Sequence, residues 1–192
     1  KLTRLMGLAL IEQSTVEADD LIAAAARKLS SEGHEVWLVS ADKDLAQCVG
    51  GNVRQLLPAP TANPKIGWRK LDRAGVEKKF GVPPERIPDY LALIGDSSDN
   101  IPGIEGVGPK TAAKWLREYG DVAGILEAAP AIKPPRFREL LPQKEALLRL
   151  NLELVTVDPK ADPGELEPPE PDARGLVGLL EEMEMKTAAR EA

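Results

Sequence analysis

The sequence predicts an α/β part followed by an all-α part, and two observations carry this prediction. Helical and strand patterns alternate in the first third of the chain, which is the order of an α/β layer. From about residue 88 to about residue 155, only helical patterns joined by short turns occur. The change from one architecture to the other therefore falls within residues 58–88.

The α/β part contains two predicted strands with helices around them. Apolar residues recur at helical spacing from position 18 to position 29, and Gly33 follows where a glycine is expected after a helix C-terminus. The branched and aromatic run at 35–40 indicates a buried strand, and 52–57 is a second strand candidate. The other elements are the end of a helix at 1–8, a helix over about 15–30, and a loop entering a helix at 41–49.

The second part follows a Pro-containing loop at 58–67. We expect a helix over about 69–80 that ends at Gly81, another from near Pro88, and a last one over about 172–188. The Pro- and acid-rich stretch 158–172 reads as a linker or surface wrap. The expected segments are an α/β core (1–60), a connecting loop and helix (61–87), an all-α domain (88–157), and an acidic wrap with a C-terminal helix (158–192).

Composition limits the kind of protein. The chain has 192 residues, of which 43% are hydrophobic, so a core can form, and no apolar run reaches the ~20 residues of a membrane helix. Cys48 is the only cysteine; it excludes an internal disulfide, fits a reducing compartment and indicates a small buried side chain. Because the chain begins with Lys1 rather than Met, we expect a fragment or a processed form.

The net charge of −6 argues weakly against binding to nucleic acid. Its distribution weakens this objection, because residues 161–192 hold nine acids and three bases, and the rest of the chain holds 22 of each. A balanced body can present both a basic face and an acidic pocket.

Seven acidic residues form three groups in the sequence, and each group has an ordinary structural explanation. The groups are Glu17, Asp19 and Asp20; Asp42 and Asp44; and Asp96 and Asp99. The first group fits a capping box with Ser14, the second could cap the following helix, and the third could form turns.

The placement of these carboxylates favours a metal site. Asp42 and Asp44 directly follow the strand 35–40, and sites in α/β sheets gather at the carboxyl ends of strands. Clustered carboxylates raise one another's pKa unless a cation neutralises them. The ligands are all oxygen atoms and His34 is the only histidine, which fits Mg2+ or Mn2+ better than zinc or copper. Two such ions ~4 Å apart can clamp a phosphodiester, whereas glycosidase chemistry needs only two carboxylates.

Residues 106–111 (GVGPKT) predict a turn that receives a phosphate. Gly106 and Gly108 let the backbone approach a ligand, and the proline that follows suits the first turn of a helix. Lys110 and Lys114 add positive charge beside free N–H groups that attract an anion, without reading a base. The alternative is a plain glycine turn between packed helices. Taken alone, the motif slightly favours this alternative over a phosphate site. The spacing does not match a Walker loop.

Three stretches together resemble the bacterial 5'-nuclease family: STVEADDLIA (14–23), LVSADKDLAQ (38–47) and GDSSDNIPGIEGVGPKTAAKWL (95–116). This family comprises the 5'-3' exonuclease domain of DNA polymerase I and stand-alone relatives similar to flap endonucleases. Each motif is moderately specific, but the three occur in order at family-like spacing, and the resemblance spans nearly the whole chain.

The resemblance implies a PIN-like α/β core, a helix-three-turn-helix DNA-binding domain, and a two-metal hydrolysis of DNA with Mg2+ or Mn2+. The first ion is served mainly by Glu17, Asp19 and Asp20, Asp42 lies between the ions, and the second ion is served by Asp44, Asp96 and Asp99. The family's hairpin on duplex phosphates, often beside a bound K+, is matched by Gly106, Gly108, Lys110 and Thr111.

The resemblance also implies duplex DNA with a 5' flap or 5' end as partner, a linked or separate DNA polymerase, and a cytoplasmic, nucleoid-associated place in bacteria. The family begins with two aspartate-bearing strands and a helical arch with a catalytic lysine and arginine. None of these occurs here, so we expect an incomplete core. The main hypothesis is a 5'-3' exonuclease and flap endonuclease as parent protein. The alternatives are a non-catalytic, sequence-independent module that binds duplex DNA, and a scaffold in which the acids are caps.

Overall fold

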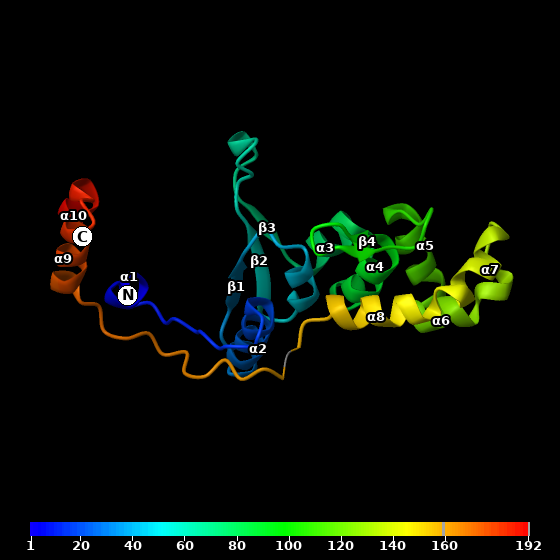
Figure 1. Cartoon of the computed structure of the whole chain (residues 1–192), viewed down its shortest axis with the longest axis horizontal. Coiled ribbons are helices and arrows are strands. Elements are labelled where there is room, and N and C mark those ends of the chain that lie inside the picture. The colour runs from blue at the N-terminus through cyan, green and yellow to red at the C-terminus, as the bar shows by residue number, and fades with distance from the viewer. Residues whose placement is uncertain (159, 192) are drawn as a thin grey trace.

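The computed structural model describes residues 1–158 and 160–191. Pro159 and Ala192, which belong to the expected segment 158–192, lie outside the described residues. Figure 1 shows a small sheet in the middle of the molecule, a group of helices on one side of it, and a separate small group of helices on the other side.

The sheet has three strands in the order β1-β2-β3: Val36–Val39, Val53–Leu57 and Arg69–Leu71. The two strands expected in the α/β part are β1 and β2; they pair in parallel, with Val36 opposite Val53. The 3-10 helix η1 (Asp44–Cys48) lies on the connection between them. Strand β3 pairs antiparallel with β2 and places Leu71 opposite Gln55.

Helix α2 (Ala18–Ser31) packs small and aliphatic side chains against one face of β1 and β2. It begins later than the helix expected from about residue 15. Glu17 is the residue before the first turn, has extended backbone angles and makes no side-chain capping bond. The expected capping box is therefore wrong. The cluster contains Ala26, Val36, Leu38, Leu45 and Val53.

The helix expected over 69–80 is wrong in its first turn. Residues 69–71 form β3, and α3 runs over Arg73–Phe80 after Asp72, whose Oδ1 accepts the N–H of Gly75 at 2.7 Å. Only Leu71 of the three strand residues is buried, so the strand is too short and polar to show an alternating pattern. Gly81 ends α3 in the left-handed conformation, as predicted.

The helices after α3 enclose the larger core. Helix α4 lies at its centre and buries Ile87, Leu91 and Leu93 completely. The all-α expectation needs one correction, because two-residue strands β4 and β5 pair within this region. The bounds are α4 Ile87–Ile94, β4 Gly95–Asp96, β5 Ile101–Pro102, α5 Pro109–Tyr119, α6 Val122–Glu127, α7 Arg136–Gln143 and α8 Glu145–Val155, with 3-10 helices at Pro64–Ile66, Pro84–Arg86 and Ala129–Ala131.

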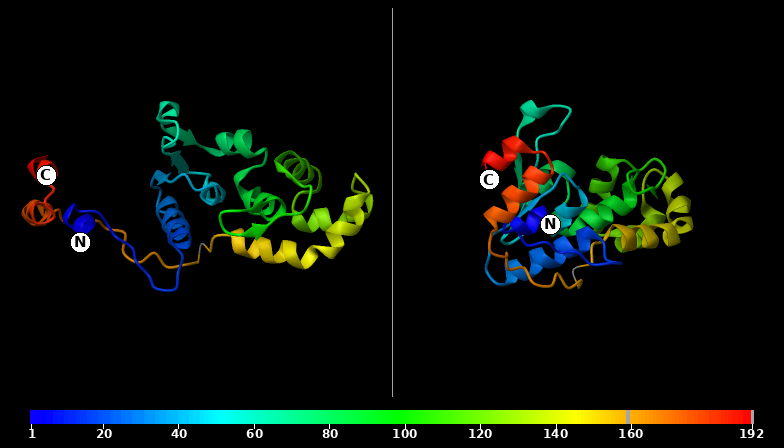
Figure 2. Two further views of the ribbon diagram at one scale, coloured as in Figure 1. Left: turned by 45° about the horizontal axis from the view of Figure 1, so that its top comes forward. Right: turned by 60° about the vertical axis from the view of Figure 1, so that its left-hand side comes forward.

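The two ends of the chain meet on the far side of the sheet (Figures 1 and 2). Helix α1 (Leu2–Leu5) packs on α9 (Ala173–Glu182), and the N–H of Asp172 donates to the carbonyl of Leu5 at 2.9 Å. The expected last helix over 172–188 is interrupted at Glu184, whose φ is +60°, and continues as α10 (Lys186–Glu191). Within the described ranges, no helix is long and apolar enough to cross a membrane.

Candidate metal centre and nucleic-acid interface

Two glycines shape the loop that carries Asp96 and Asp99. Gly95 has a φ of +76°, and a Cβ there would overlap the backbone of Gly103. A Cβ on Gly103 would in turn overlap the carbonyl of Ile94. The close crossing of β4 and β5 therefore requires glycine at both ends of the loop, with the two aspartates between them.

Helix α8 fixes this loop through one buried amide. The side chain of Asn151 donates from Nδ2 to the carbonyl of Ala92 at 3.1 Å and to the carbonyl of Pro102 at 2.7 Å. Asn151 is almost completely buried. The last turn of α4 and the end of β5 are therefore tied to one side chain.

A second buried amide fixes the turn after β1. Gln55 Nε2 donates to the carbonyl of Ser40 at 3.0 Å and to the carbonyl of Asp42. The carboxylate of Asp42 accepts the N–H of Asp44 at 2.9 Å, which tightens the turn. The sheet thus holds the backbone of the Asp42–Asp44 turn in place.

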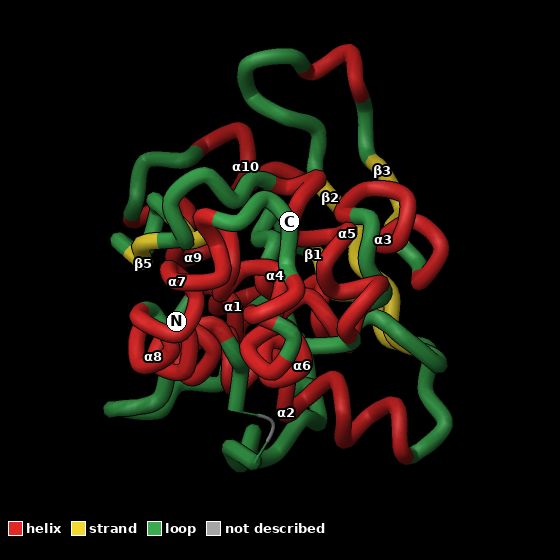
Figure 3. Tube along the Cα trace, turned by 90° about the vertical axis from the view of Figure 1, so that its right-hand side faces the viewer, coloured by secondary structure: helices red, strands yellow, loops and turns green. Residues whose placement is uncertain are grey.

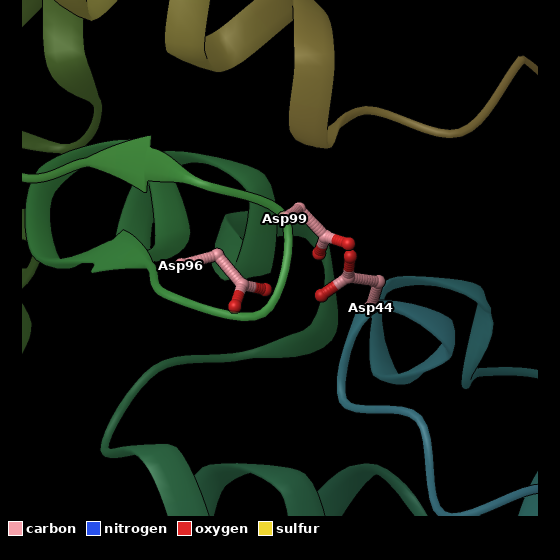
Figure 4. Close-up of side chains that lie close together, drawn as sticks. All are labelled: Asp44, Asp96 and Asp99. Carbon is pink, nitrogen blue, oxygen red and sulfur yellow. The ribbon is translucent and has the colours of Figure 1, made fainter.

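The two segments bring three carboxylates together. One oxygen from each of Asp44, Asp96 and Asp99 lies within 4.8 Å of the other two, and Figure 4 shows Asp44 and Asp99 pointing toward one another. Asp44 Oδ1 is buried and has no hydrogen-bond partner among the described residues, and Asp96 Oδ2 is buried with the Lys43 ammonium as its contact. An all-oxygen set of this kind suits a hard divalent cation.

Lys43 was not singled out from the sequence, but it lies at this cluster. Its ammonium contacts Asp96 Oδ2 and is 3.9 Å from Asp44 Oδ1. A lysine between two aspartates ordinarily indicates a solvated turn, so the sequence gives no signal for this position. The contact places a positive charge where the carboxylates converge.

The carboxylates differ in their proton affinity. Burial raises the pKa of Asp44 to about 6, although Lys43 opposes the shift. Burial also acts to raise the pKa of Asp96, but Lys43 and the N–H of Ser98 outweigh it, so this pKa is lowered. A hydrogen bond with Asp96 raises the pKa of Asp99. The pKa of Asp96 is therefore lowered, whereas those of Asp44 and Asp99 are raised.

The other predicted ligands lie outside this group of three. Burial raises the pKa of Asp19, and Asp42, Glu17, Asp20 and Asp99 raise it further, so Asp19 senses the field of both acidic segments. Asp20 accepts the backbone N–H of Asp158 at 2.6 Å. Glu17 and Asp42 are exposed.

The GVGPKT turn is anchored by Val107, which is buried and donates its N–H to the carbonyl of Ile104 at 2.9 Å. Gly106 has a φ of +78°, a conformation that favours glycine. Gly108 precedes α5 with a φ of −103°, and a Cβ there would have no atom within 4 Å. The backbone angle therefore explains why residue 106 is glycine, whereas no contact or backbone angle within the described residues requires glycine at position 108.

The basic residues near this turn have no acidic partner. Lys110 and Lys114 are exposed and Thr111 is half-buried, and neither lysine has a carboxylate within 4.0 Å in the part of the chain that the structure describes. Arg136 from α7 joins them: its Nη2 lies 2.6 Å from the Cβ position of Gly106, and its Cζ is 4.7 Å from the ring centroid of Phe137. Sequence reasoning missed Arg136 because it lies 30 positions after Gly106 in the sequence.

Family descriptions match consecutive parts of the chain. The description "5'-3' exonuclease, N-terminal resolvase-like domain" matches residues 1–81, and "5'-3' exonuclease, C-terminal SAM fold" matches residues 82–172. A 5'-3' exonuclease of Aquifex aeolicus is 40% identical over 100% of this chain and 64% of its own length. DNA polymerase I of Thermus thermophilus is 37% identical over 100% of this chain and 22% of its own length. The chain thus spans less than two thirds of these relatives.

Solved structures agree in fold. The bacteriophage T5 flap endonuclease, in a pseudo-enzyme-product complex with DNA and metal ions, matches 74% of this chain and 50% of its own with a TM-score of 0.62 and 30% identity. Together, the two matched family regions cover residues 1–172 without a gap. The chain therefore belongs to the 5'-3' exonuclease family.

Proposed function

We propose that the chain supplies part of a divalent-metal centre for hydrolysis of DNA phosphodiesters from a 5' end. The observation that carries this proposal is the convergence of Asp44, Asp96 and Asp99 within 4.8 Å. Their oxygen-only chemistry favours Mg2+ or Mn2+, and a cation would satisfy the buried Asp44 Oδ1, which lacks a hydrogen-bond partner among the described residues.

A second ion would be held by the remaining predicted ligands, Glu17, Asp19, Asp20 and Asp42. The raised pKa of Asp19, caused by burial and then by the other three acids and Asp99, supports their proximity. Two bound ions would activate a water molecule and stabilise the leaving oxygen. The chain's own contribution is to hold Asp42, Asp44, Asp96 and Asp99 on two turns fixed by Gln55 and Asn151, and to place Glu17, Asp19 and Asp20 at the start of α2.

The GVGPKT turn would hold the duplex beside this centre. Gly108 leaves its backbone open to a phosphate, while Lys110, Thr111, Lys114 and Arg136 surround it with donors. A K+ ion at the turn is part of the proposal. Because these groups read no base edge, binding would be independent of sequence.

The activity we propose for the whole protein is 5'-3' exonuclease and structure-specific 5' flap endonuclease. The Aquifex aeolicus relative is named 5'-3' exonuclease, and the T5 flap endonuclease was solved with DNA and metal ions. The relatives named DNA polymerase I support a linked or separate polymerase as partner, and with it a place at the bacterial nucleoid.

The finer architecture also belongs to this proposal. We assign residues 1–60 to a PIN-like core, 61–87 to a connection, 88–157 to a helix-three-turn-helix domain and 158–192 to an acidic wrap. Strand β1 lies at the edge of the sheet and Val39 on it is 60% exposed, which supports further strands completing the core.

Cleavage of a 5'-labelled flap duplex tests the proposal. From the whole protein we expect short 5' products in Mg2+ or Mn2+, none in EDTA, and a loss of cleavage but not of duplex binding in Asp99→Asn. The control is Asp72→Asn. Asparagine can still cap α3, and position 72 is far from the cluster in the sequence. Duplex binding that weakens with salt, without cleavage in any metal, would instead support the non-catalytic binding module.

A further inference from the structure

The hairpin formed by β2, β3 and their connection projects from the molecule. Figures 1, 2 and 3 show the connection between β2 and β3 extending beyond the sheet. Its outer part contains the 3-10 turn at Pro64–Ile66 and Gly67 with a φ of +68°. We call the hairpin, residues 53–71, the basic finger.

The basic finger carries positive charge only. No Asp or Glu occurs between Asp44 and Asp72, although the whole chain has a net charge of −6. Arg54 pairs with Glu35 at 3.5 Å. Within the described residues, the other three bases have no carboxylate within 4.0 Å; they are Lys65, Arg69 and Lys70. The finger therefore presents uncompensated cations on a projecting element.

Large apolar side chains are exposed among these bases. Trp68 is 60% exposed and Ile66 is 48% exposed. On the sheet below, Lys70 Nζ is 5.0 Å from the ring centroid of Trp37, and Arg54 Cζ is 5.9 Å from it. Aromatic rings interleaved with cations match a polymer that offers both stacking faces and phosphates.

We propose that the basic finger binds unpaired nucleotides of a DNA strand. Trp68 stacks on a base, and Lys65, Arg69 and Lys70 neutralise phosphates. Paired bases already stack on one another, so an exposed indole gains most from an unpaired base. The choice of DNA rests on the proposed function. The finger differs from the GVGPKT turn, which has no exposed aromatic ring and suits a duplex backbone.

Fluorescence anisotropy in EDTA tests this role with a labelled oligo(dT) and a blunt duplex. We expect Trp68→Ala to weaken oligo(dT) binding by roughly five- to 100-fold and to leave duplex binding within about twofold. Lys65→Glu should weaken oligo(dT) binding and flatten its salt dependence. Arg27→Glu is the matched control, because Arg27 is an exposed base on α2 without an ion pair among the described residues, and it should change neither affinity.

The outcomes separate the finger from the proposed function. Unchanged oligo(dT) binding in Trp68→Ala, or an equal loss for oligo(dT) and duplex, overturns the role of the finger even when duplex binding depends on Lys110. Equal competition by poly-glutamate shows attraction to charge alone and also overturns it. A folded wild-type chain that binds neither polymer contradicts the proposed function itself.

Discussion

Single residues at the candidate metal centre are held in an electrostatically strained arrangement. Partial burial raises the pKa of Asp44 to about 6, whereas Lys43 and the N–H of Ser98 hold the pKa of Asp96 below its ordinary value. A divalent cation that enters the cluster must take the place of the Lys43 ammonium on Asp96. Metal binding therefore exchanges one charge pairing for another rather than filling a neutral cavity.

Replacing Asp44 by Asn should stabilise the metal-free chain at neutral pH. The folded pKa of about 6 exceeds the ordinary 3.8, so the folded state binds this proton more tightly than the unfolded state. The stability contributed by the proton is full below pH 3.8 and is lost as pH rises through about 6. We expect the gain in the free energy of unfolding from Asp44→Asn to grow by about 1–2 kcal/mol between about pH 4.5 and about pH 7.5.

Urea denaturation in EDTA measures this difference across the pH range. Asp72→Asn is the control, because Asp72 is an exposed aspartate outside the cluster. A gain from Asp44→Asn that is constant with pH would contradict the raised pKa.

Gly108→Ala should separate folding from DNA binding. Alanine can adopt the backbone angles of Gly108, and the added methyl group would have no atom within 4 Å. The free energy of unfolding should change by less than about 1 kcal/mol, whereas duplex binding should weaken because the methyl group stands where a phosphate approaches. Binding by anisotropy and stability by urea denaturation check both parts. Full duplex binding by Gly108→Ala would leave a plain structural turn as the explanation of the motif.

At the scale of elements, one side chain of α8 controls the loop between β4 and β5. Asn151→Leu removes two hydrogen bonds and leaves the carbonyls of Ala92 and Pro102 without their buried partner. We expect a loss of about 1–3 kcal/mol in stability and a tenfold or greater loss in Mn2+ affinity, although Asn151 is not a ligand. Calorimetric titration measures the affinity, and Leu154→Ala at an exposed site on α8 is the control. Unchanged Mn2+ affinity in a destabilised Asn151→Leu would show that the loop holds itself.

The sequence predicted the elements with a strong local pattern. Strands β1 and β2 and helix α2 follow from apolar periodicity, and Gly33 and Gly81 mark helix ends. Strand β3 was not predicted, because Arg69 and Lys70 are both exposed and the strand lacks an alternation of buried and exposed residues. The interruption of the last helix at Glu184 was not predicted, because no glycine or proline occurs there to indicate a helix end.

The site was only partly predictable for a related reason. Carboxylates at the ends of strands and in a Gly-bounded loop carry a local signal, and these positions include Asp44, Asp96 and Asp99. The contact of Lys43 with Asp96 and the approach of Arg136 to Gly106 depend on packing between distant segments. No local pattern encodes such pairs.

For the whole molecule, the candidate metal centre lies where the sheet region meets the helical region. Asp44 comes from η1, next to the sheet, whereas Asp96 and Asp99 come from the loop after α4. Gln47 on η1 links the two regions: its Nε2 donates to the carbonyl of Val155 at 3.0 Å, and its Oε1 accepts the N–H of Val157 at 3.1 Å. The geometry of the site thus depends on the docking of the two regions.

Charge is also distributed along the molecule. Residues 161–172 hold five acids and no base, and this segment runs from the end of α8 toward α9, away from α5 (Figure 1), so it leaves the GVGPKT turn and its lysines uncovered. This separation reconciles a net charge of −6 with the proposed phosphate-binding surface.

The most direct test of this account is a calorimetric Mn2+ titration of the wild-type chain, Asp99→Asn and Asp72→Asn. Asp99 is exposed, so its replacement should leave the fold intact. The account predicts Mn2+ binding by the wild type and by Asp72→Asn, and an affinity at least about tenfold weaker in Asp99→Asn. Equal Mn2+ affinity in Asp99→Asn, or no binding by the folded wild type, would contradict a metal centre at Asp44, Asp96 and Asp99.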